Sequence, residues 1–183
     1  MERGFAATRL EDVARRAGVS KGTLYLYYAN KEDLFKAVVR QSIVPTIDDA
    51  DASVAEFDGH SAELLRHVIL SWWRRIGATK VSGISKLILA EADNFPELAR
   101  FYRQEVMTRG ITMMSNMLER GIRRGEFREI DVAQTAQVLI APLIMLSTWK
   151  HTIAPCERCD LQPEAFLTAF LDITLNGLLP ATK

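Results

Sequence analysis

Apolar residues recur at spacings of three and four along most of the chain, and this period is typical of helices with one buried face. The alternating pattern of a half-buried strand is nearly absent. The sequence therefore predicts an all-α protein. The expected helices cover about residues 8–16, 20–28, 31–43, 61–78, 81–93, 96–125, 131–152 and 164–179.

Signals for the ends of helices are concentrated near the N-terminus. Thr8 and Glu11 match a capping box, in which each side chain accepts a hydrogen bond from a free backbone amide of the first turn. Gly18 suits the left-handed position that ends a helix, because it has no Cβ. Ser20 and Asn30 stand where they can cap the next two helices.

Two prolines interrupt the pattern further along the chain. Pro45 opens an acidic stretch, which we interpret as a kink, a helix extension or a loop and as the boundary between two domains, 1–44 and 45–183. Pro142 should bend the helix expected over 131–152 or mark a local break in it. Asp131 resembles a cap for that helix.

The first two expected helices are short, and a tight turn that contains Gly18 joins them. This is the helix-turn-helix pattern, whose second helix enters the major groove of DNA. Small side chains at the leading end let the backbone approach bases and phosphates, and Ser20, Gly22 and Thr23 are small. The alternative is a structural helical hairpin that binds nothing.

Larger side chains in the same segment offer further contacts with DNA. Lys21 can present its charge to a phosphate or a guanine edge. Tyr25 and Tyr27 are rigid and amphipathic, so they can lie along the sugar-phosphate wall and donate hydroxyls to phosphate oxygens. Lys31 opens the third helix, where the positive end of the helix dipole attracts a phosphate. The candidate DNA-binding residues are Ser20, Lys21, Gly22, Thr23, Tyr25, Tyr27 and Lys31.

Charge and composition narrow the class of protein. The 23 Lys and Arg balance the 23 Asp and Glu, but residues 1–44 hold eight basic against five acidic residues, so this end carries +3 and the remainder −3. A basic end on an acidic body suits a polyanionic partner. We expect charged residues to interrupt every candidate membrane span, and the start lacks the apolar core of a signal peptide. We therefore expect a cytoplasmic protein with no membrane partner.

Catalytic and metal chemistry find little support in the sequence. The three histidines, His60, His67 and His151, fall in no metal-binding spacing, and no phosphate loop or nucleophile motif is present. Cys156 and Cys159 form a Cys-x-x-Cys pair that suits zinc, a redox dithiol or an ordinary loop. Zinc needs four ligands and His151 is a third at best, so we favour the loop. We expect no enzyme activity, no metal and no cofactor.

The stretch TRLEDVARRAGVSKGTLYLYYANKEDLFKAVV resembles the DNA-binding domain of the tetracycline-repressor (TetR) family of bacterial transcription regulators, in register from about Gly4 to Arg40. The stretches AEADNFPELARFYRQEV and LERGIRRGEF resemble the ligand-binding half of one subgroup. The resemblance implies a homodimeric repressor that a small, largely apolar effector releases from a palindromic double-stranded DNA operator. It also implies that residues 1–44 bind DNA and that residues 45–183 bind the effector and dimerise.

One departure from the family concerns the N-terminus. In the family a helix of about four turns precedes the glycine-aromatic pair, and here only three residues precede Gly4-Phe5. We expect Phe5, Val13, Leu24 and Phe35 to lose an apolar partner as a result. A start assigned too late, a trimmed chain and an impaired DNA-binding domain are the open explanations, and we favour a missing segment. The alternative function is therefore a helical dimer that binds a small molecule but no DNA.

The last two expected helices are apolar on more than one face, so they should be buried on two sides. The simpler interpretation is the core of the monomer, but the resemblance favours a four-helix dimer interface. The expected interface residues are Leu139, Leu143, Leu146, Phe166, Phe170, Ile173 and Leu178.

Large and adaptable apolar side chains in the body suit an effector pocket, although such a stripe is more often core than pocket. Glu91, Glu105 and Arg109 are the candidate polar anchors, or they lie on solvated faces. The candidate pocket residues are Trp72, Trp73, Glu91, Phe101, Glu105, Arg109, Met113, Met117 and Trp149.

Overall fold

The computed structural model describes residues 4–152 and 162–180, and these residues form helices and contain no β-strand. The all-α prediction is therefore confirmed. The α-helices are α1 (Leu10–Ala17), α2 (Lys21–Tyr27), α3 (Lys31–Ser42), α4 (Val44–Glu56), α5 (Ser61–Trp72), α6 (Gly83–Glu91), α7 (Pro96–Tyr102), α8 (Arg109–Arg123), α9 (Val132–Thr152) and α10 (Pro163–Leu178). Three further segments are the π-helices η1 (Trp73–Gly77) and η3 (Arg103–Thr108) and the 3-10 helix η2 (Lys80–Ser82).

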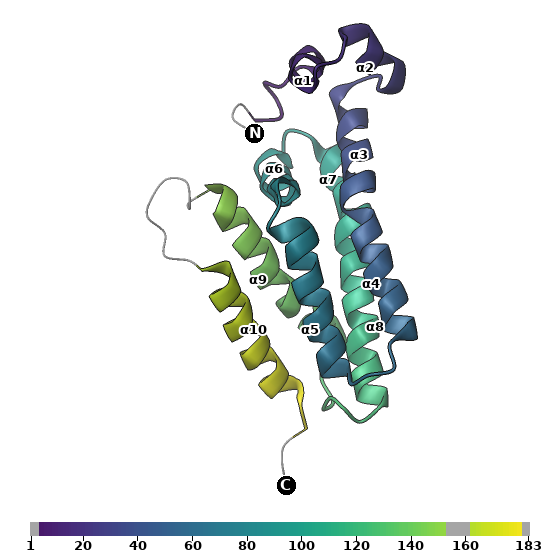
Figure 1. Cartoon of the computed structure of the whole chain (residues 1–183), viewed down its shortest axis with the longest axis vertical. Coiled ribbons are helices and arrows are strands. Elements are labelled where there is room, and N and C mark those ends of the chain that lie inside the picture. Colours follow the sequence, from purple (N-terminus) through teal and green to yellow (C-terminus); the bar gives the residue numbers. More distant parts are fainter. Residues whose placement is uncertain (1–3, 153–161, 181–183) are drawn as a thin grey trace.

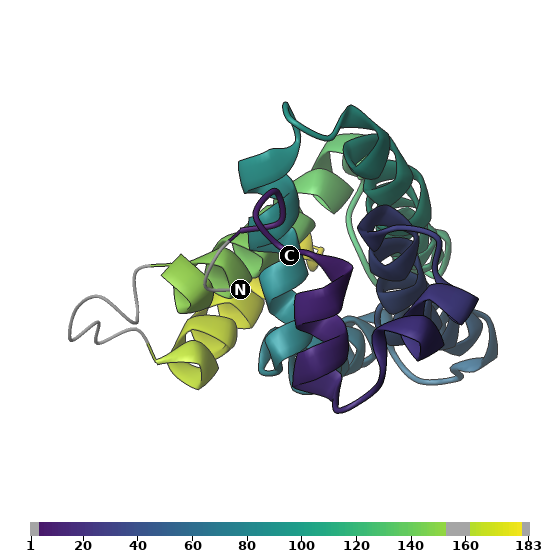
Figure 2. The same cartoon turned by 90° about the horizontal axis from the view of Figure 1, so that it is seen from above.

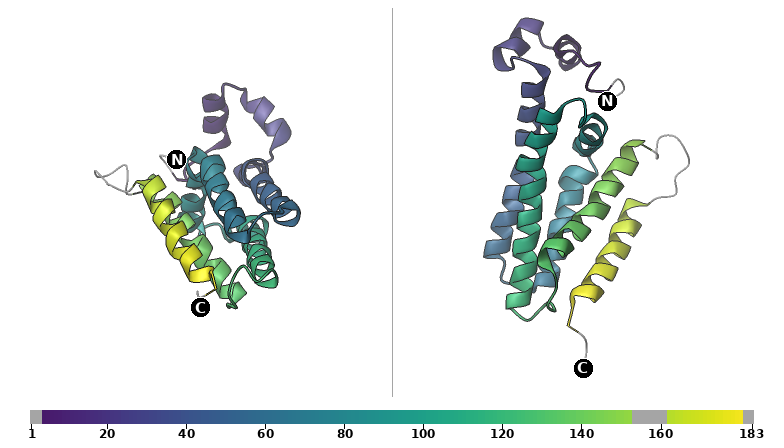
Figure 3. Two further views of the ribbon diagram at one scale, coloured as in Figure 1. Left: turned by 60° about the horizontal axis from the view of Figure 1, so that its bottom comes forward. Right: turned by 180° about the vertical axis from the view of Figure 1, so that it is seen from behind.

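The helices divide between a small head, which contains α1 and α2, and a longer body, which contains the helices from α4 onward (Figure 1). Helices α1 and α2 lie at one end of the molecule, and α3 leads from them into α4 along the side of the body. Figure 2 looks onto the head, with α1 and α2 nearest the viewer. Figure 3 shows from behind how α8, α9 and α10 follow one another across the body. The proposed domain boundary between residues 44 and 45 falls in the first turn of α4.

Two apolar clusters hold these parts together. The larger cluster fills the body with side chains from α5, α8, α9 and α10, and Leu64, Met117 and Leu146 in it are fully buried. The smaller cluster lies under the head, where Phe5 and side chains of α3 and α4 meet α6 and α7. The head and the body therefore share one of the two cores.

Most of the predicted helix ends are confirmed. Ser20 accepts a hydrogen bond from the Thr23 N–H (2.9 Å), and Asn30 accepts one from the Asp33 N–H (2.7 Å). Gly18 ends α1 with a φ of +71°, in the left-handed region.

The capping box at Thr8 and Glu11 is wrong. Helix α1 begins at Leu10 after Arg9, which makes no side-chain cap, and the Thr8 hydroxyl donates to the Gly4 carbonyl instead (2.6 Å). Later in the chain, Asp131 does cap α9, because its carboxylate accepts from the Gln134 N–H (3.0 Å).

The proline-containing segments are both helical. Pro45 lies in the first turn of α4, where a missing N–H costs nothing, so the acidic stretch extends the helical path from α3. Helix α9 runs through Pro142 without a break. The long helix expected over 96–125 is present, but its centre is the π-helix η3. A second π-helix, η1, follows α5.

Phe5 and Phe35 are buried although no helix precedes Phe5 in the described residues, because Phe5 has aromatic partners. Val13 and Leu24, in contrast, are half-buried. The Phe5 ring makes edge contacts with Phe35 in α3 (5.9 Å between centroids) and with Phe95 before α7 (4.9 Å). Only 6% of Phe5 and 7% of Phe35 is exposed. The loop before α7 supplies a partner that the sequence pattern did not reveal.

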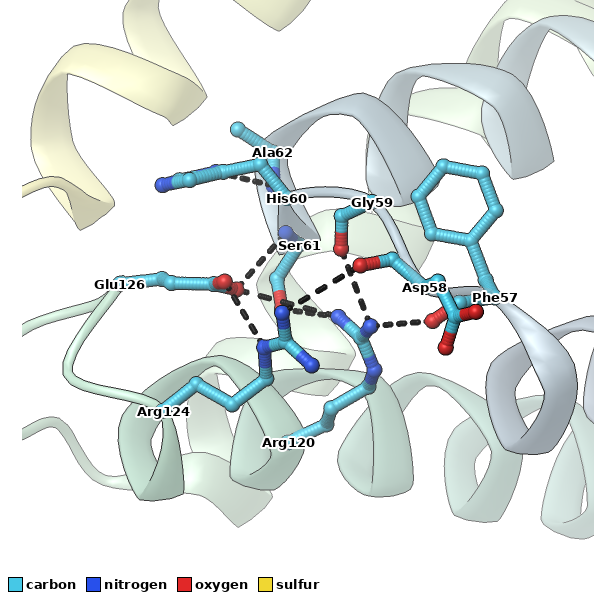
Figure 4. Close-up of polar contacts among 9 residues, drawn as sticks. All are labelled: Phe57, Asp58, Gly59, His60, Ser61, Ala62, Arg120, Arg124 and Glu126. Carbon is cyan, nitrogen blue, oxygen red and sulfur yellow. Dashed lines mark hydrogen bonds and ion pairs between the residues drawn. The ribbon is translucent and has the colours of Figure 1, made fainter.

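A polar network closes the end of the body that lies away from the head (Figure 4). Arg120 of α8 is 8% exposed, and its guanidinium donates to the Ser61 hydroxyl and to the carbonyls of Phe57 and Gly59. Glu126, in the turn after α8, accepts from the Ser61 N–H (2.8 Å) and from Nε of Arg124 (2.8 Å). The network ties the α4–α5 turn to the end of α8.

Glu126 makes this network sensitive to acid. Burial alone would raise the pKa of Glu126, but the hydrogen bonds from Ser61 and Arg124 outweigh it and lower the pKa to about 2. Because the unfolded chain takes up this proton near pH 4.5, the contribution of Glu126 to stability is present above pH 4.5 and lost as the pH falls toward about 2.

We expect Glu126→Gln to reduce the free energy of unfolding at pH 6 and to close the gap to wild type as the pH falls from about 4.5 to about 2. Urea denaturation at constant ionic strength across this range measures the gap. Glu119→Gln, at an exposed site on α8, is the control and should follow the wild-type curve. A gap for Glu126→Gln that stays constant down to pH 2 would contradict the assignment.

Helix α9 corrects one expectation from the sequence. Val132–Thr152 is long and apolar enough to cross a membrane by length and composition, so charged residues do not interrupt every candidate span. One such helix is weak evidence, because a core helix of a soluble protein passes the same test. Leu139 and Leu146 of this helix lie in the core of the body.

Candidate DNA-binding head and effector cavity

Helix α2 has no buried residue, although it is rich in apolar and aromatic side chains. Leu26 is 83% exposed and Tyr27 is 76% exposed. At Gly22 a Cβ would meet only the Ser20 hydroxyl, at 3.7 Å, so the leading end of α2 is open to the outside. An apolar surface of this kind needs a partner from outside the chain.

Lys21 and Tyr25 both contact Glu11 of α1. The Lys21 Nζ lies 2.7 Å from Glu11 Oε1, and the Tyr25 hydroxyl donates to the same oxygen at 3.3 Å. The hydrogen bond with Glu11 raises the pKa of Lys21, and the bond from Lys21 lowers the pKa of Glu11. These two candidate DNA-binding side chains are therefore held together on the outer surface of the head.

The Lys31 side chain makes hydrogen bonds with the backbone of its own protein. Its Nζ donates to the carbonyls of Phe5 (2.9 Å) and Ala6 (3.0 Å) and lies 4.7 Å from the centroid of the Phe5 ring. The ammonium of Lys31, at the start of α3, thus binds the turn formed by residues 4–7, which we call the N-terminal turn. A phosphate contact by Lys31 remains a prediction.

Glu91, a candidate pocket residue, fastens the same N-terminal turn to the body. From the end of α6 its Oε1 accepts from the Phe5 N–H (3.0 Å). Gly4 adopts a φ of +69°, and a Cβ there would lie 3.2 Å from this oxygen. Hydrogen bonds from the Asn94 amide and the backbone N–H groups of Ala6 and Phe5 lower the pKa of Glu91. Glu91 therefore joins α6 to the head and does not line the cavity described below.

Replacing Glu91 with alanine should free the N-terminal turn. We expect the Phe5 amide to exchange its hydrogen about tenfold faster, because it loses its acceptor, while the unfolding free energy falls by only about 1 kcal/mol. Amide hydrogen exchange followed by NMR measures the effect. Glu97→Ala, at an exposed ion pair on α7, is the control. Unchanged exchange at Phe5 would contradict the role of Glu91.

A cavity of about 220 Å³ lies in the body between α4, α5 and α8. Ile47 and Ala50 of α4, Val68 of α5 and Met114 of α8 are among its apolar lining residues. The π-helices η1 and η3 both contribute to the wall, as do residues of α6, α7 and α9. Irregular π-helical turns often mark functional sites, because they leave the regular packing of a helix.

Two pairs of polar residues in the cavity wall interact with each other. Asp49 of α4 and Arg75 of η1 line it as an ion pair (2.7 Å), and both side chains are exposed. Ser85 of α6 and Tyr102 of α7 also line it and share a hydrogen bond of 3.2 Å. Burial raises the pKa of Tyr102, so its phenol stays protonated.

Two of the candidate pocket residues, Trp72 and Met113, line this cavity. Trp73 and Met117 are buried in the large core, where they leave no surface for a ligand. Trp149 is half-buried near the end of α9 and is not in the cavity wall.

The remaining candidate pocket residues bind other parts of the chain. Phe101 is buried beneath the Arg40 guanidinium, 5.0 Å from its ring centroid. Glu105 forms an ion pair with Arg40 (3.7 Å), and Arg109 forms one with Asp48. These pairs connect η3 and α8 to α3 and α4. The sequence pattern does not predict that α4 lines the cavity, because the acidic stretch after Pro45 is equally compatible with a kink, a helix extension or a loop.

Four of the expected interface residues are buried within the chain itself. Leu139, Leu143, Leu146 and Leu178 have between 0% and 6% of their surface exposed, so they leave little surface for a second copy. Phe166 and Phe170 are half-buried. Ile173 of α10 is 73% exposed, and Val138 and Met145 of α9 are exposed as well. The free apolar surface of α9 and α10 therefore lies on other faces of these helices.

Metal chemistry finds no site in the described residues. Residues 4–152 and 162–180 contain no group of three His, Cys, Asp or Glu side chains that could hold a metal ion. Cys156 and Cys159 lie outside the described residues.

The sequence matches two known families. Residues 1–38 match the bacterial regulatory proteins of the tetR family, and residues 58–160 match the tetracyclin repressor-like C-terminal domain. The fatty acid metabolism regulator protein of Bacillus subtilis is 26% identical over 180 residues, which cover 97% of this chain and 88% of that protein.

Solved structures show the same fold. FadR from Bacillus subtilis, in complex with stearoyl-CoA, superposes with a TM-score of 0.73 at 22% identity over 96% of this chain and 91% of that one. The SmeT–triclosan complex gives a TM-score of 0.78 at 22% identity over 98% of this chain and 85% of that one. The two family matches together cover more than half of the chain. The chain therefore belongs to the TetR family of transcriptional regulators.

Proposed function

We propose that this TetR-family regulator is a homodimeric repressor that binds a palindromic operator through residues 1–44. The exposure of α2 carries the proposal, because a short helix with Leu26 and Tyr27 uncovered needs an external partner. Lys21 and Tyr25 beside them would contact phosphates, while Gly22 and Thr23 would let the backbone approach the bases. A regulator that acts on bacterial DNA would be found in the cytoplasm.

The second part of the proposal concerns residues 45–183. The cavity between α4, α5 and α8 would bind a small, largely apolar effector, as its lining suggests. In the two complexes of similar fold, stearoyl-CoA carries a long apolar acyl chain, and triclosan is a largely apolar molecule. The exposed apolar face of α9 and α10, which includes Val138, Met145 and Ile173, would form the dimer interface.

Fluorescence anisotropy with DNA from the region flanking its own gene tests the proposal. We expect specific binding that weakens with salt, with a log–log slope of about 0.9 for each neutralised phosphate. Lys21→Ala should weaken binding to all sequences and reduce the slope by about 1. Lys80→Ala, on the exposed part of η2 in the body, is the control. Absence of binding at low salt would favour a helical dimer that binds a small molecule but no DNA.

A further inference from the structure

We propose that the cavity takes an uncharged, mainly apolar molecule with one hydrogen-bond acceptor, such as a carbonyl or ether oxygen, and that one hydroxyl of the Ser85–Tyr102 pair donates to this oxygen. The inference rests on the proposed function of the cavity as the effector site. It specifies the chemical class of the effector beyond its apolar character.

The two hydroxyls have one hydrogen to spare. Ser85 Oγ and Tyr102 Oη lie 3.2 Å apart, and either can donate to the other. Two hydroxyl groups carry two donor hydrogens, and the hydrogen bond between the two groups uses one of them. Neither hydroxyl makes another hydrogen bond in the described part of the chain. Whichever group donates, the second hydrogen is left for an acceptor in the cavity.

The position of the pair favours a ligand over water as this acceptor. Both residues line the cavity, and only 9% of Tyr102 is exposed. Around them the wall is apolar, with Ile43, Ile76 and Val106 from three different elements. In such surroundings a hydroxyl hydrogen without an acceptor is unfavourable, so an acceptor of matching position is selected.

The charges of the cavity argue against an ionised group at the same point. Asp49 and Arg75 are 62% and 45% exposed and neutralise each other at 2.7 Å. Tyr102 remains a neutral phenol, because burial raises its pKa. An ion beside Ser85 and Tyr102 would have no opposite charge to offset its lost hydration. The inner polar pair therefore suits a neutral oxygen.

The size of the cavity sets the scale of a suitable probe. A cavity of about 150 Å³ with an apolar wall holds benzene. The present cavity of about 220 Å³ is larger and has room for two fused rings. We choose 2-acetylnaphthalene, which carries one carbonyl, and 2-ethylnaphthalene, which has the same shape without the oxygen. Trp72 in the wall reports binding through its fluorescence.

We expect wild-type protein to bind 2-acetylnaphthalene about five- to tenfold more tightly than 2-ethylnaphthalene, as one additional neutral hydrogen bond allows. The double variant Tyr102→Phe/Ser85→Ala should bring this ratio close to one while leaving the affinity for 2-ethylnaphthalene unchanged, because in either single variant the remaining hydroxyl still has a hydrogen to donate. Ser71→Ala removes another hydroxyl of the same wall and should keep the wild-type ratio. Thermal unfolding of each variant confirms that it is folded.

The outcomes separate this inference from the proposed function. Equal affinities for the two probes in wild type would overturn the inference and leave the cavity as an effector site. A preference for the ketone that survives in the double variant Tyr102→Phe/Ser85→Ala would also overturn it, because the oxygen would then be bound elsewhere. Failure of both probes to bind would overturn the cavity as the effector site and the inference with it.

Discussion

Replacing Arg120 with alanine is expected to lower the free energy of unfolding by about 3 kcal/mol or more, the largest loss that we expect from any single change at a polar residue. Arg120 is 8% exposed and donates to the Ser61 hydroxyl and to the carbonyls of Phe57 and Gly59. Its removal leaves the buried Ser61 hydroxyl and the part-buried carbonyls of Phe57 and Gly59 without this donor, and an unmet bond costs about 1–3 kcal/mol where the group is buried. Glu126 keeps its bonds with Ser61 and Arg124, which limits the loss.

Arg123→Ala is the matched control for this prediction. Arg123 lies one turn along α8 and pairs with Glu119 at 3.5 Å, but its side chain is 68% exposed. An exposed pair of this kind contributes about 0–1 kcal/mol. Urea denaturation at one fixed protein concentration compares the variants, because a dimer would make the stability depend on concentration. Equal losses for the two variants would contradict the role of the buried network.

The head could be predicted from the sequence because its signals are local. Gly18, Ser20 and Asn30 each act on a backbone group within three residues, so their roles follow from position alone. The exposed face of α2 could also be inferred, because the helix-turn-helix pattern makes α2 the helix that enters the major groove. Thr8 shows the limit of such reasoning, because its hydroxyl had a second acceptor available in the Gly4 carbonyl.

The body could be predicted only in outline. Trp72 and Trp73 are adjacent in the sequence, yet Trp72 lines the cavity and Trp73 fills the core. Periodicity shows that a helical face is buried but not whether it meets a neighbour or an empty space. The same limit explains why Leu139 and Leu146 were expected at a dimer interface and belong to the core of their own chain.

The remaining differences between the sequence predictions and the structure come from contacts between segments that are distant in the sequence. Glu91 meets the Phe5 N–H across 86 positions, and Ser61 meets Glu126 across 65. Nothing in the local pattern around these residues distinguishes them from solvated charges. Together with the ion pair between Arg109 and Asp48, such contacts fix how the head and α4 sit on the body. An effector in the cavity would act on this same set of contacts, since α4 and α6 both line it.

Replacing Gly22 with leucine is expected to weaken operator binding by about 100-fold or more without loss of stability. A Cβ at Gly22 would meet only the Ser20 hydroxyl, at 3.7 Å, so the free protein has room for the side chain. Leucine also favours the helix by up to about 1 kcal/mol relative to glycine. The major groove is about 12 Å wide and a helix with side chains about 10–12 Å across, so a recognition helix fits with little clearance.

Gly22→Leu is expected to weaken DNA binding while leaving the stability of the protein unchanged or slightly higher, so the two measurements can be told apart. Loss of DNA binding in a variant that melts at the wild-type temperature or above cannot be attributed to unfolding. Glu119→Leu places the same side chain on an exposed position of α8, away from the head, and should leave DNA affinity unchanged. Anisotropy titrations and thermal melts of the two variants provide the comparison. If Gly22→Leu binds the operator as tightly as wild type, the leading end of α2 does not enter the groove, and the DNA surface must lie on another part of the head.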